Sequence, residues 1–125
     1  MRSLPFTIEN LNGGFMKLEG ILRVEENTLV FEYQKKDAVV EAYQSELRTE
    51  KITISELDML EYKKGWFSGK LILHGKTAKS FGDLPGKDLT ERVLKVRRKN
   101  RDVAASISSN LNLKLSEEKL RELDD

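Results

Sequence analysis

Cysteine is absent from this chain of 125 residues, and histidine occurs once. Without thiols the protein can form no disulfide framework and has no thiolate nucleophile. A zinc site built from cysteine and histidine is excluded for the same reason. A chain without disulfides fits a reducing compartment, so we expect a cytoplasmic location.

Long apolar runs are also missing. No segment approaches the roughly 20 apolar residues that a membrane-spanning helix needs. Residues 1–10 lack the apolar core and the cleavage site of a signal peptide. We therefore expect no transmembrane segment. The remaining membrane role is peripheral attachment to the inner membrane face. The length suits a single domain with one modest core.

Catalytic groups are scarce. A nucleophile needs a general base within hydrogen-bond reach, and His74, at the end of an expected strand, is better interpreted as a surface or rim residue. Gly75-Lys76-Thr77 matches the end of a phosphate-binding loop, but Lys70 stands where that motif needs its first glycine. No loop has calcium-binding spacing. We predict that the protein is not an enzyme and uses no metal or cofactor.

The net charge of +1 hides an uneven distribution of charged residues. Residues 1–62 carry 7 basic and 12 acidic side chains, whereas residues 63–101 carry 12 basic and 3 acidic ones. Residues 102–125 have a net charge of −3. The basic segment can create a positive surface field. Strand alternation can equally divide its side chains between two faces, so both outcomes stay open.

Most of the chain consists of short runs typical of β-strands, separated by turn signals. Apolar alternation predicts strands over residues 15–25, 28–34, 51–54, 57–63, 67–74 and 89–98, with a very short one at 80–81. Lys63-Lys64-Gly65 predicts a tight hairpin loop. Residues 36–50 fit a strand or a helical turn. Residues 1–14 are expected to be an N-terminal extension, either a tail or an extra packed segment.

The apolar period changes from two to four around Asn100, and either Asn100 or Asp102 can cap the start of a helix. One helical stripe then comprises Val103, Ile107, Leu111 and Leu115. Residues 111–115 also alternate, so we expect the helix to end near residue 113. A tail or a short second helix then follows over residues 114–125.

Four motifs occur in a fixed order: Ile52-Thr53-Ile54-Ser55-Glu56-Leu57, Tyr62-Lys63-Lys64-Gly65-Trp66-Phe67-Ser68-Gly69-Lys70-Leu71, Leu84-Pro85-Gly86, and Val96-Arg97-Arg98-Lys99-Asn100-Arg101-Asp102-Val103-Ala104. Together they resemble the bacterial pleckstrin-homology-like (PH-like) domains over residues 15–113. The resemblance implies a mainly β fold, a partly open barrel of two antiparallel, near-orthogonal sheets with about seven strands. A C-terminal α-helix would cap that barrel. The resemblance implies no single activity, because this superfold hosts lipid, peptide and scaffold roles.

One departure from the family concerns lipid binding. Phosphoinositide-binding PH domains carry basic residues in and around the first hairpin. The matching loop here, Glu25-Glu26-Asn27, is acidic. We therefore carry over no lipid-binding residue from that motif.

The candidate binding residues come from the basic segment. Trp66 and Phe67 follow two lysines in the predicted hairpin, and such a cluster can anchor a protein partner or a membrane interface. A small domain also needs its aromatic residues for the core, so we expect the two rings to pack against the barrel and the hairpin. The side chains assigned to anion or partner binding are Lys63, Lys64, Trp66, Lys70, Lys95, Arg97 and Arg98.

Two functional hypotheses follow. The leading one is a non-catalytic interaction or scaffolding module that binds protein partners, with self-association as a further option. An exposed sheet edge beside the terminal helix could accept a peptide strand. The alternative is peripheral binding to anionic membrane lipid through a basic face, which the acidic first hairpin puts second. No nucleic acid is expected, because the basic run at residues 95–101 lacks interleaved aromatics.

Overall fold

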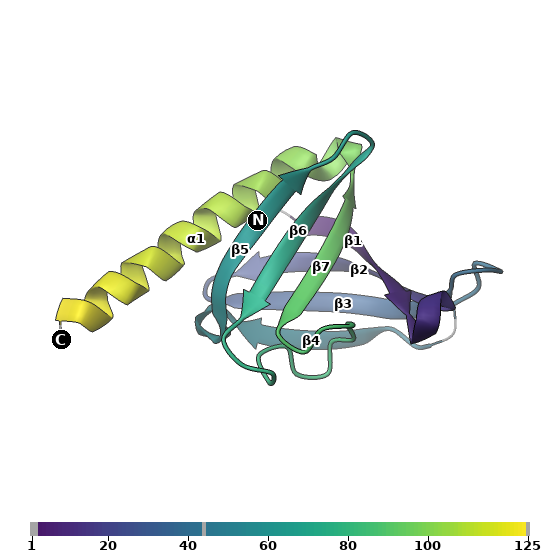
Figure 1. The fold of residues 1–125 in the computed structure, drawn as a ribbon, viewed down its shortest axis with the longest axis horizontal. Coiled ribbons are helices and arrows are strands. Elements are labelled where there is room, and N and C mark those ends of the chain that lie inside the picture. The colour runs from purple at the N-terminus through teal and green to yellow at the C-terminus, as the bar shows by residue number, and fades with distance from the viewer. Residues whose placement is uncertain (1–2, 44, 125) are drawn as a thin grey trace.

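Seven strands form one antiparallel sheet, and a single helix follows them in the computed structural model, which describes residues 3–43 and 45–124 (Figure 1). The strands are β1 (Ser3–Leu11), β2 (Met16–Glu25), β3 (Thr28–Asp37), β4 (Arg48–Thr53), β5 (Leu57–Lys64), β6 (Ser68–Gly75) and β7 (Glu91–Arg97). The helix is α1 (Arg101–Asp124), and short 3₁₀ turns are η1 (Asn12–Gly14), η2 (Ile54–Glu56) and η3 (Arg98–Asn100). The predicted mainly β fold is confirmed.

The sheet is open and bends sharply near its middle. Its strand order is β4-β3-β2-β1-β7-β6-β5, so β4 and β5 form the two edges. Among the described residues, β1 pairs with β7 at one position, Thr7 opposite Lys95, whereas it pairs with β2 at seven. Figure 1 shows the β5–β7 half crossing in front of the β1–β4 half. The two expected sheets are therefore two halves of one partly open barrel.

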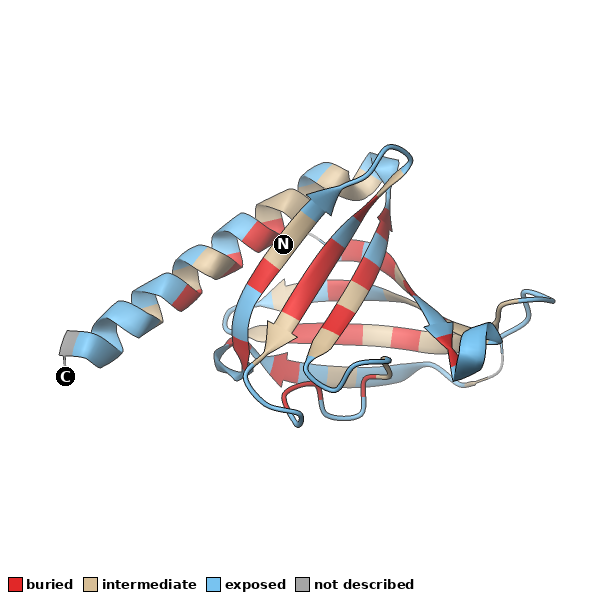
Figure 2. Cartoon of the chain, in the orientation of Figure 1, coloured by how far each residue is buried: buried red, intermediate tan, exposed pale blue. Residues whose placement is uncertain are grey.

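The core lies between these halves, because alternate residues of each strand point inward (Figure 2). Leu18, Leu29 and Leu71 are completely buried. The rings of Phe6 and Phe31 meet edge to face, with centroids 5.9 Å apart. A single apolar cluster includes residues of both halves, which makes the barrel one unit.

The N-terminal segment belongs to the barrel. The expected extension over residues 1–14 contains β1, which lies in the middle of the sheet between β2 and β7. Leu4, Phe6 and Ile8 of this strand are buried in the core. The described part of the domain therefore begins at Ser3, and the expected boundary at residue 15 is corrected.

Helix α1 is one continuous helix of 24 residues rather than a helix that ends near residue 113. The predicted apolar stripe is confirmed, because Ile107, Leu111 and Leu115 are buried against the barrel. The side chain of Asn112 accepts a hydrogen bond from the Leu60 N–H at 2.9 Å and donates one to the Leu60 carbonyl at 2.7 Å. The helix therefore satisfies backbone groups on the free edge of β5.

The long connection between β6 and β7 covers the end of the barrel away from the start of α1. The expected short strand at residues 80–81 is a turn instead, and Phe81 and Leu84 of this connection enter the core. Arg92 holds the connection in place, because its Nε donates to the Leu84 carbonyl at 2.9 Å and its guanidinium stacks on Phe81. Burial lowers the pKa of this guanidinium.

Residues 36–50, left open by the sequence, are mostly a loop. Strand β3 continues to Asp37, the loop follows, and β4 begins at Arg48, while Gln44 lies outside the described residues. Among the described residues, α1 is the longest helix, and neither it nor any shorter one is apolar enough over a sufficient length to cross a bilayer.

Candidate functional site

The tip of the β5–β6 hairpin exposes two aromatic rings. Trp66 and Phe67 are each 81% exposed, and their rings contact each other edge to face with centroids 6.5 Å apart. The expectation that these rings pack against the barrel and the hairpin is wrong. The core is completed without them by other large apolar side chains, among them Phe6, Phe31 and Phe81.

The tip is tied to the first turn of α1. A guanidinium nitrogen of Arg101 donates a hydrogen bond to the Gly65 carbonyl at 2.7 Å. Gly69 permits this approach, because a Cβ at that position would lie 3.3 Å from the Arg101 Cγ and 3.0 Å from the Tyr62 ring. The hairpin tip, the end of β7 and the start of α1 therefore gather at one end of the molecule (Figure 1).

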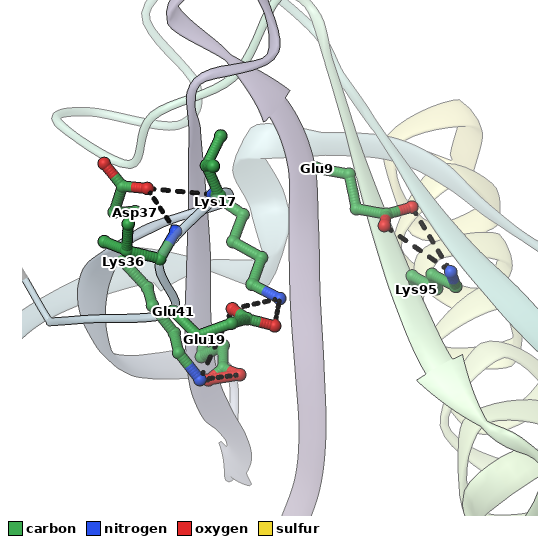
Figure 3. Close-up of polar contacts among 9 residues, drawn as sticks. Glu9, Lys17, Glu19, Lys36, Asp37, Glu41 and Lys95 are labelled. Carbon is green, nitrogen blue, oxygen red and sulfur yellow. Dashed lines mark hydrogen bonds and ion pairs between the residues drawn. The ribbon is translucent and has the colours of Figure 1, made fainter.

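Three lysines form a row across the outer face of the barrel. Lys63 of β5 stands directly opposite Lys70 of β6, which stands opposite Lys95 of β7. Like charges at directly opposed positions destabilise a sheet. Lys63 and Lys70 have no ion pair within the described chain, whereas Lys95 lies 3.4 Å from a Glu9 carboxylate oxygen (Figure 3). Repulsion within this row lowers the stability of the sheet locally, and a bound anionic ligand would reduce that repulsion.

The other predicted cations lie next to this row. Lys64 ends β5 beside the tip, Arg97 stands opposite Ser68 at the start of β6, and Arg98 begins η3. All three are exposed. Lys63, Lys64, Trp66, Lys70, Arg97 and Arg98 therefore belong to one end of the molecule, and Lys95 lies at its inner margin with its charge partly neutralised.

Three residues of this end were not assigned from the sequence. Phe67 shares the tip, Lys99 is exposed in η3, and Arg101 orients the tip. Lys99 and Arg101 belong to the same basic run as Arg97 and Arg98, so the run itself was the available signal. The close approach between Arg101 and Gly65 has no sequence signal, because it depends on how α1 meets the hairpin. We call the surface formed by Lys63, Lys64, Trp66, Phe67, Lys70, Arg97, Arg98 and Lys99 the tip surface.

Charges mix on the other half of the barrel. Lys17 lies 2.9 Å from Glu41, and Lys36 lies 3.3 Å from Glu19 (Figure 3). The hydrogen bond from Lys17 holds the pKa of the Glu41 carboxyl below its usual value. Both outcomes left open by the sequence therefore occur. Opposite charges neutralise each other on β2 and β3, and positive charge stays unbalanced at the tip surface.

His74 lies on the outer face of β6, away from the tip. Its Nε2 is 2.6 Å from a Glu61 carboxylate oxygen, and its Nδ1 is 3.7 Å from one of Glu91. Among the described residues, no hydroxyl group forms a hydrogen bond with this histidine that would let it act as a base on a nucleophile. Across residues 3–43 and 45–124, no group of three or more histidine or acidic side chains is arranged to hold a metal ion.

No protein-family model, curated protein or solved structure matches the chain. A functional argument for this chain therefore depends on the geometry and charge of its own surfaces, foremost the tip surface.

Proposed function

We propose that the protein is a non-catalytic PH-like module that attaches peripherally to anionic membrane lipid through the tip surface. The observation that carries this proposal is the pair of rings at Trp66 and Phe67, each 81% exposed at the apex of a hairpin. Aromatic residues flanked by lysines favour the interface between lipid headgroups and acyl chains. The open barrel with a terminal helix supports the PH-like part of the proposal.

The magnitudes explain why both kinds of side chain are needed. Each basic residue near an anionic surface contributes about 1 kcal/mol, so four of them supply about 4 kcal/mol. That energy alone corresponds to a dissociation constant of about 1 mM. Insertion of Trp66 and Phe67 adds apolar burial and confines the cations to the headgroup layer. Binding of useful strength therefore requires the rings and the cations together.

We rank the lipid hypothesis first, in the reverse of the order that the sequence favoured. The acidic loop at Glu25 and Glu26 argued against lipid as the expected first hairpin, but it joins β2 to β3 and is the second hairpin. It lies beside the middle of α1, where the Lys114 ammonium donates to the Glu26 carbonyl at 3.0 Å. Lys114 is 13 residues beyond Arg101 along the helix, which is roughly 20 Å. That distance is about two Debye lengths at physiological salt, so the acidic loop has little effect at the tip.

The test is co-sedimentation with vesicles of phosphatidylcholine, with and without phosphatidylserine, at low and physiological salt. We expect retention on anionic vesicles at low salt and a steep loss as salt increases. The Trp66→Ala plus Phe67→Ala variant should fold normally and lose retention. Val39→Ala plus Val40→Ala, which removes two exposed apolar side chains elsewhere, is the matched control and should bind like the wild type. Absence of retention on anionic vesicles at low salt would refute the proposal.

A second candidate function, binding to a protein partner or to a second copy, is supported by a different observation. Leu115 is the last buried residue among those whose burial the structure describes, and the helix continues beyond it to Asp124. Leu113, Leu120 and Leu123 of α1 are 61%, 62% and 81% exposed. Sedimentation velocity tests the self-association branch: a single monomeric boundary at all concentrations would remove it. We rank this candidate second, because the exposed leucines do not indicate the chemistry of a partner.

A further inference from the structure

A depression opens where β1 and β7 diverge. The two strands pair at Thr7 and Lys95 and then separate toward the start of β1 and the end of β7. The depression between them has a volume of about 270 Å³. Phe6 and Gly20 line its apolar part. We call this depression the wedge.

Three cations line the wedge: Lys95, Arg97 and Lys99. Arg97 and Lys99 are exposed and form no ion pair within the described residues. One carboxylate, Glu19, also lines the wedge, but it pairs with Lys36 at 3.3 Å, and the neighbouring Glu9 lies 3.4 Å from Lys95. The local field at the two free cations is therefore positive.

Polar groups that can donate hydrogen bonds also line the wedge. Thr7 contributes a half-buried hydroxyl beside Lys95. The amide nitrogen of Asn100 is buried and has no hydrogen-bond partner among residues 3–43 and 45–124. Native structures rarely leave such donors unpaired. Asn100 lines the wedge, so a ligand oxygen bound there would offer an acceptor to this residue.

We propose that the wedge binds a phosphate monoester, with the Arg97 guanidinium and the Lys99 ammonium as its main ligands. A guanidinium matches the oxygens of a phosphate with two parallel hydrogen bonds, and an ammonium adds a compact positive charge. This inference rests on the proposed membrane function, for which it names the headgroup chemistry. The same chemistry occurs in lipid headgroups and in soluble phosphate esters.

The wedge is continuous with the tip surface, which favours the lipid source. A neighbouring hollow of about 440 Å³ is also lined by Phe67, and it shares four residues with the wedge: Thr7, Glu19, Lys95 and Arg97. A protein whose Trp66 and Phe67 rings enter the acyl boundary would hold the wedge beside the headgroup layer. A phosphate monoester on a lipid would then reach Arg97 and Lys99 without leaving the membrane.

The first experiment titrates inorganic phosphate into ¹⁵N-labelled protein and follows the backbone amide signals. We expect saturable shifts at Thr7, Arg97, Lys99 and Asn100. Arg97→Gln plus Lys99→Gln should weaken phosphate binding about tenfold or more, because two charged hydrogen-bond donors are lost. Lys76→Gln plus Lys79→Gln removes two exposed lysines at the opposite end of β6 and should leave the titration unchanged.

The second experiment compares phosphatidylcholine vesicles that carry equal surface charge from phosphatidic acid or from oleate. The wild type should prefer phosphatidic acid about tenfold, and the Arg97→Gln plus Lys99→Gln variant should lose this preference. Equal retention on both vesicles, together with no phosphate shifts at the wedge, would overturn this inference while leaving the membrane function intact. Shifts of the wedge amide signals on addition of phosphate, without retention on either kind of vesicle, would support the site and assign it to a soluble phosphate ester. The same result would refute the membrane function.

Discussion

Arg101, in the first turn of α1, donates a hydrogen bond of 2.7 Å to the carbonyl oxygen of Gly65 at the tip of the β5–β6 hairpin. This contact joins residues that are 36 positions apart in the chain. It fixes the direction in which Trp66 and Phe67 leave the barrel, because the carbonyl of Gly65 directly precedes them. The helix that caps the barrel therefore also orients the proposed membrane-binding tip.

Replacing Arg101 should weaken lipid binding by more than the loss of one charge. In Arg101→Ala the tip loses its hydrogen bond and samples more orientations, so vesicle affinity should decrease about tenfold. Arg98→Ala is the matched control, since it removes an exposed cation with no hydrogen bond in the described chain and should cost about fivefold. Co-sedimentation measures both variants. Equal losses in the two variants would mean that the contact does not orient the tip.

The lysine row predicts opposite effects on stability and on binding. Lys70→Thr removes the central charge of the Lys63–Lys70–Lys95 row, so the free energy of unfolding should rise by about 0.5 kcal/mol. Retention on anionic vesicles should decrease about fivefold at the same time. Urea unfolding and co-sedimentation measure the two quantities.

The control for this variant is Lys51→Thr, which makes the same replacement on the outer face of β4. Lys51 stands opposite Val30, so its removal relieves no repulsion between opposed lysines. We expect a smaller gain in the free energy of unfolding and no change in vesicle retention. A Lys70→Thr protein that is less stable than the wild type would contradict the proposed repulsion.

The contact between Asn112 and β5 should be important for stability. Asn112→Ala leaves the Leu60 N–H and carbonyl without their side-chain partner beneath α1, which should lower the free energy of unfolding by about 1–3 kcal/mol. Asn110→Ala, at an exposed position of the same helix, should change it little. Chemical denaturation of the two variants provides the comparison, and equal stabilities would show that water replaces the Asn112 contacts.

Stability should depend on pH through Asp88. The N–H and the hydroxyl of Thr90 donate hydrogen bonds to its carboxylate at 2.9 and 3.1 Å, and they hold the pKa of Asp88 below its usual value. A carboxyl with a lowered pKa in the folded state stabilises the fold above its unfolded pKa of about 4. That stabilisation disappears as the pH falls through the lower, folded value.

Asp88→Asn should therefore be less stable than the wild type at neutral pH, and the difference should shrink as the solution is acidified below about pH 4. Urea denaturation at several pH values measures this difference. A difference between the two proteins that stays constant with pH would contradict the assigned role of the Asp88 carboxylate.

Most of the barrel could be predicted from apolar alternation, but β1 could not. Leu4, Phe6 and Ile8 alternate as the inward residues of a strand do. Pro5 lies between them, and it argues against a strand inside a sheet. A proline is usually confined to strand edges because it lacks an N–H donor. Here Pro5 lies past the single β1–β7 pairing at Thr7, where β7 has already diverged. An interior strand can therefore contain a proline at this position.

The length of α1 was underestimated for a different physical reason. Alternating leucines at residues 111–115 suggested an end to the helix, but Leu111 and Leu115 share the buried stripe while Leu113 faces solvent. The following segment contains strong helix formers. It is also anchored at Lys119, whose ammonium donates to the Asp58 carbonyl at 3.2 Å. That anchor depends on tertiary structure and leaves no pattern in the sequence.

The candidate site was predicted in part. The basic run identified most of its cations, but the exposure of Trp66 and Phe67 depends on whether the core needs them. Phe6 lies on the unpredicted strand β1, and Phe81 on a connection expected to contain a short strand. Once these rings fill the barrel, the two aromatic residues of the hairpin have no position inside it.

Trp66 is the only tryptophan in the chain, so its fluorescence reports on the tip alone. The most direct test of the proposed function is its emission spectrum during titration with vesicles of phosphatidylcholine and phosphatidylserine at low salt. We predict a shift to shorter wavelength that saturates, reverses on addition of salt, and is absent with phosphatidylcholine alone. An emission spectrum that stays unchanged at a large excess of anionic vesicles would contradict insertion of the tip.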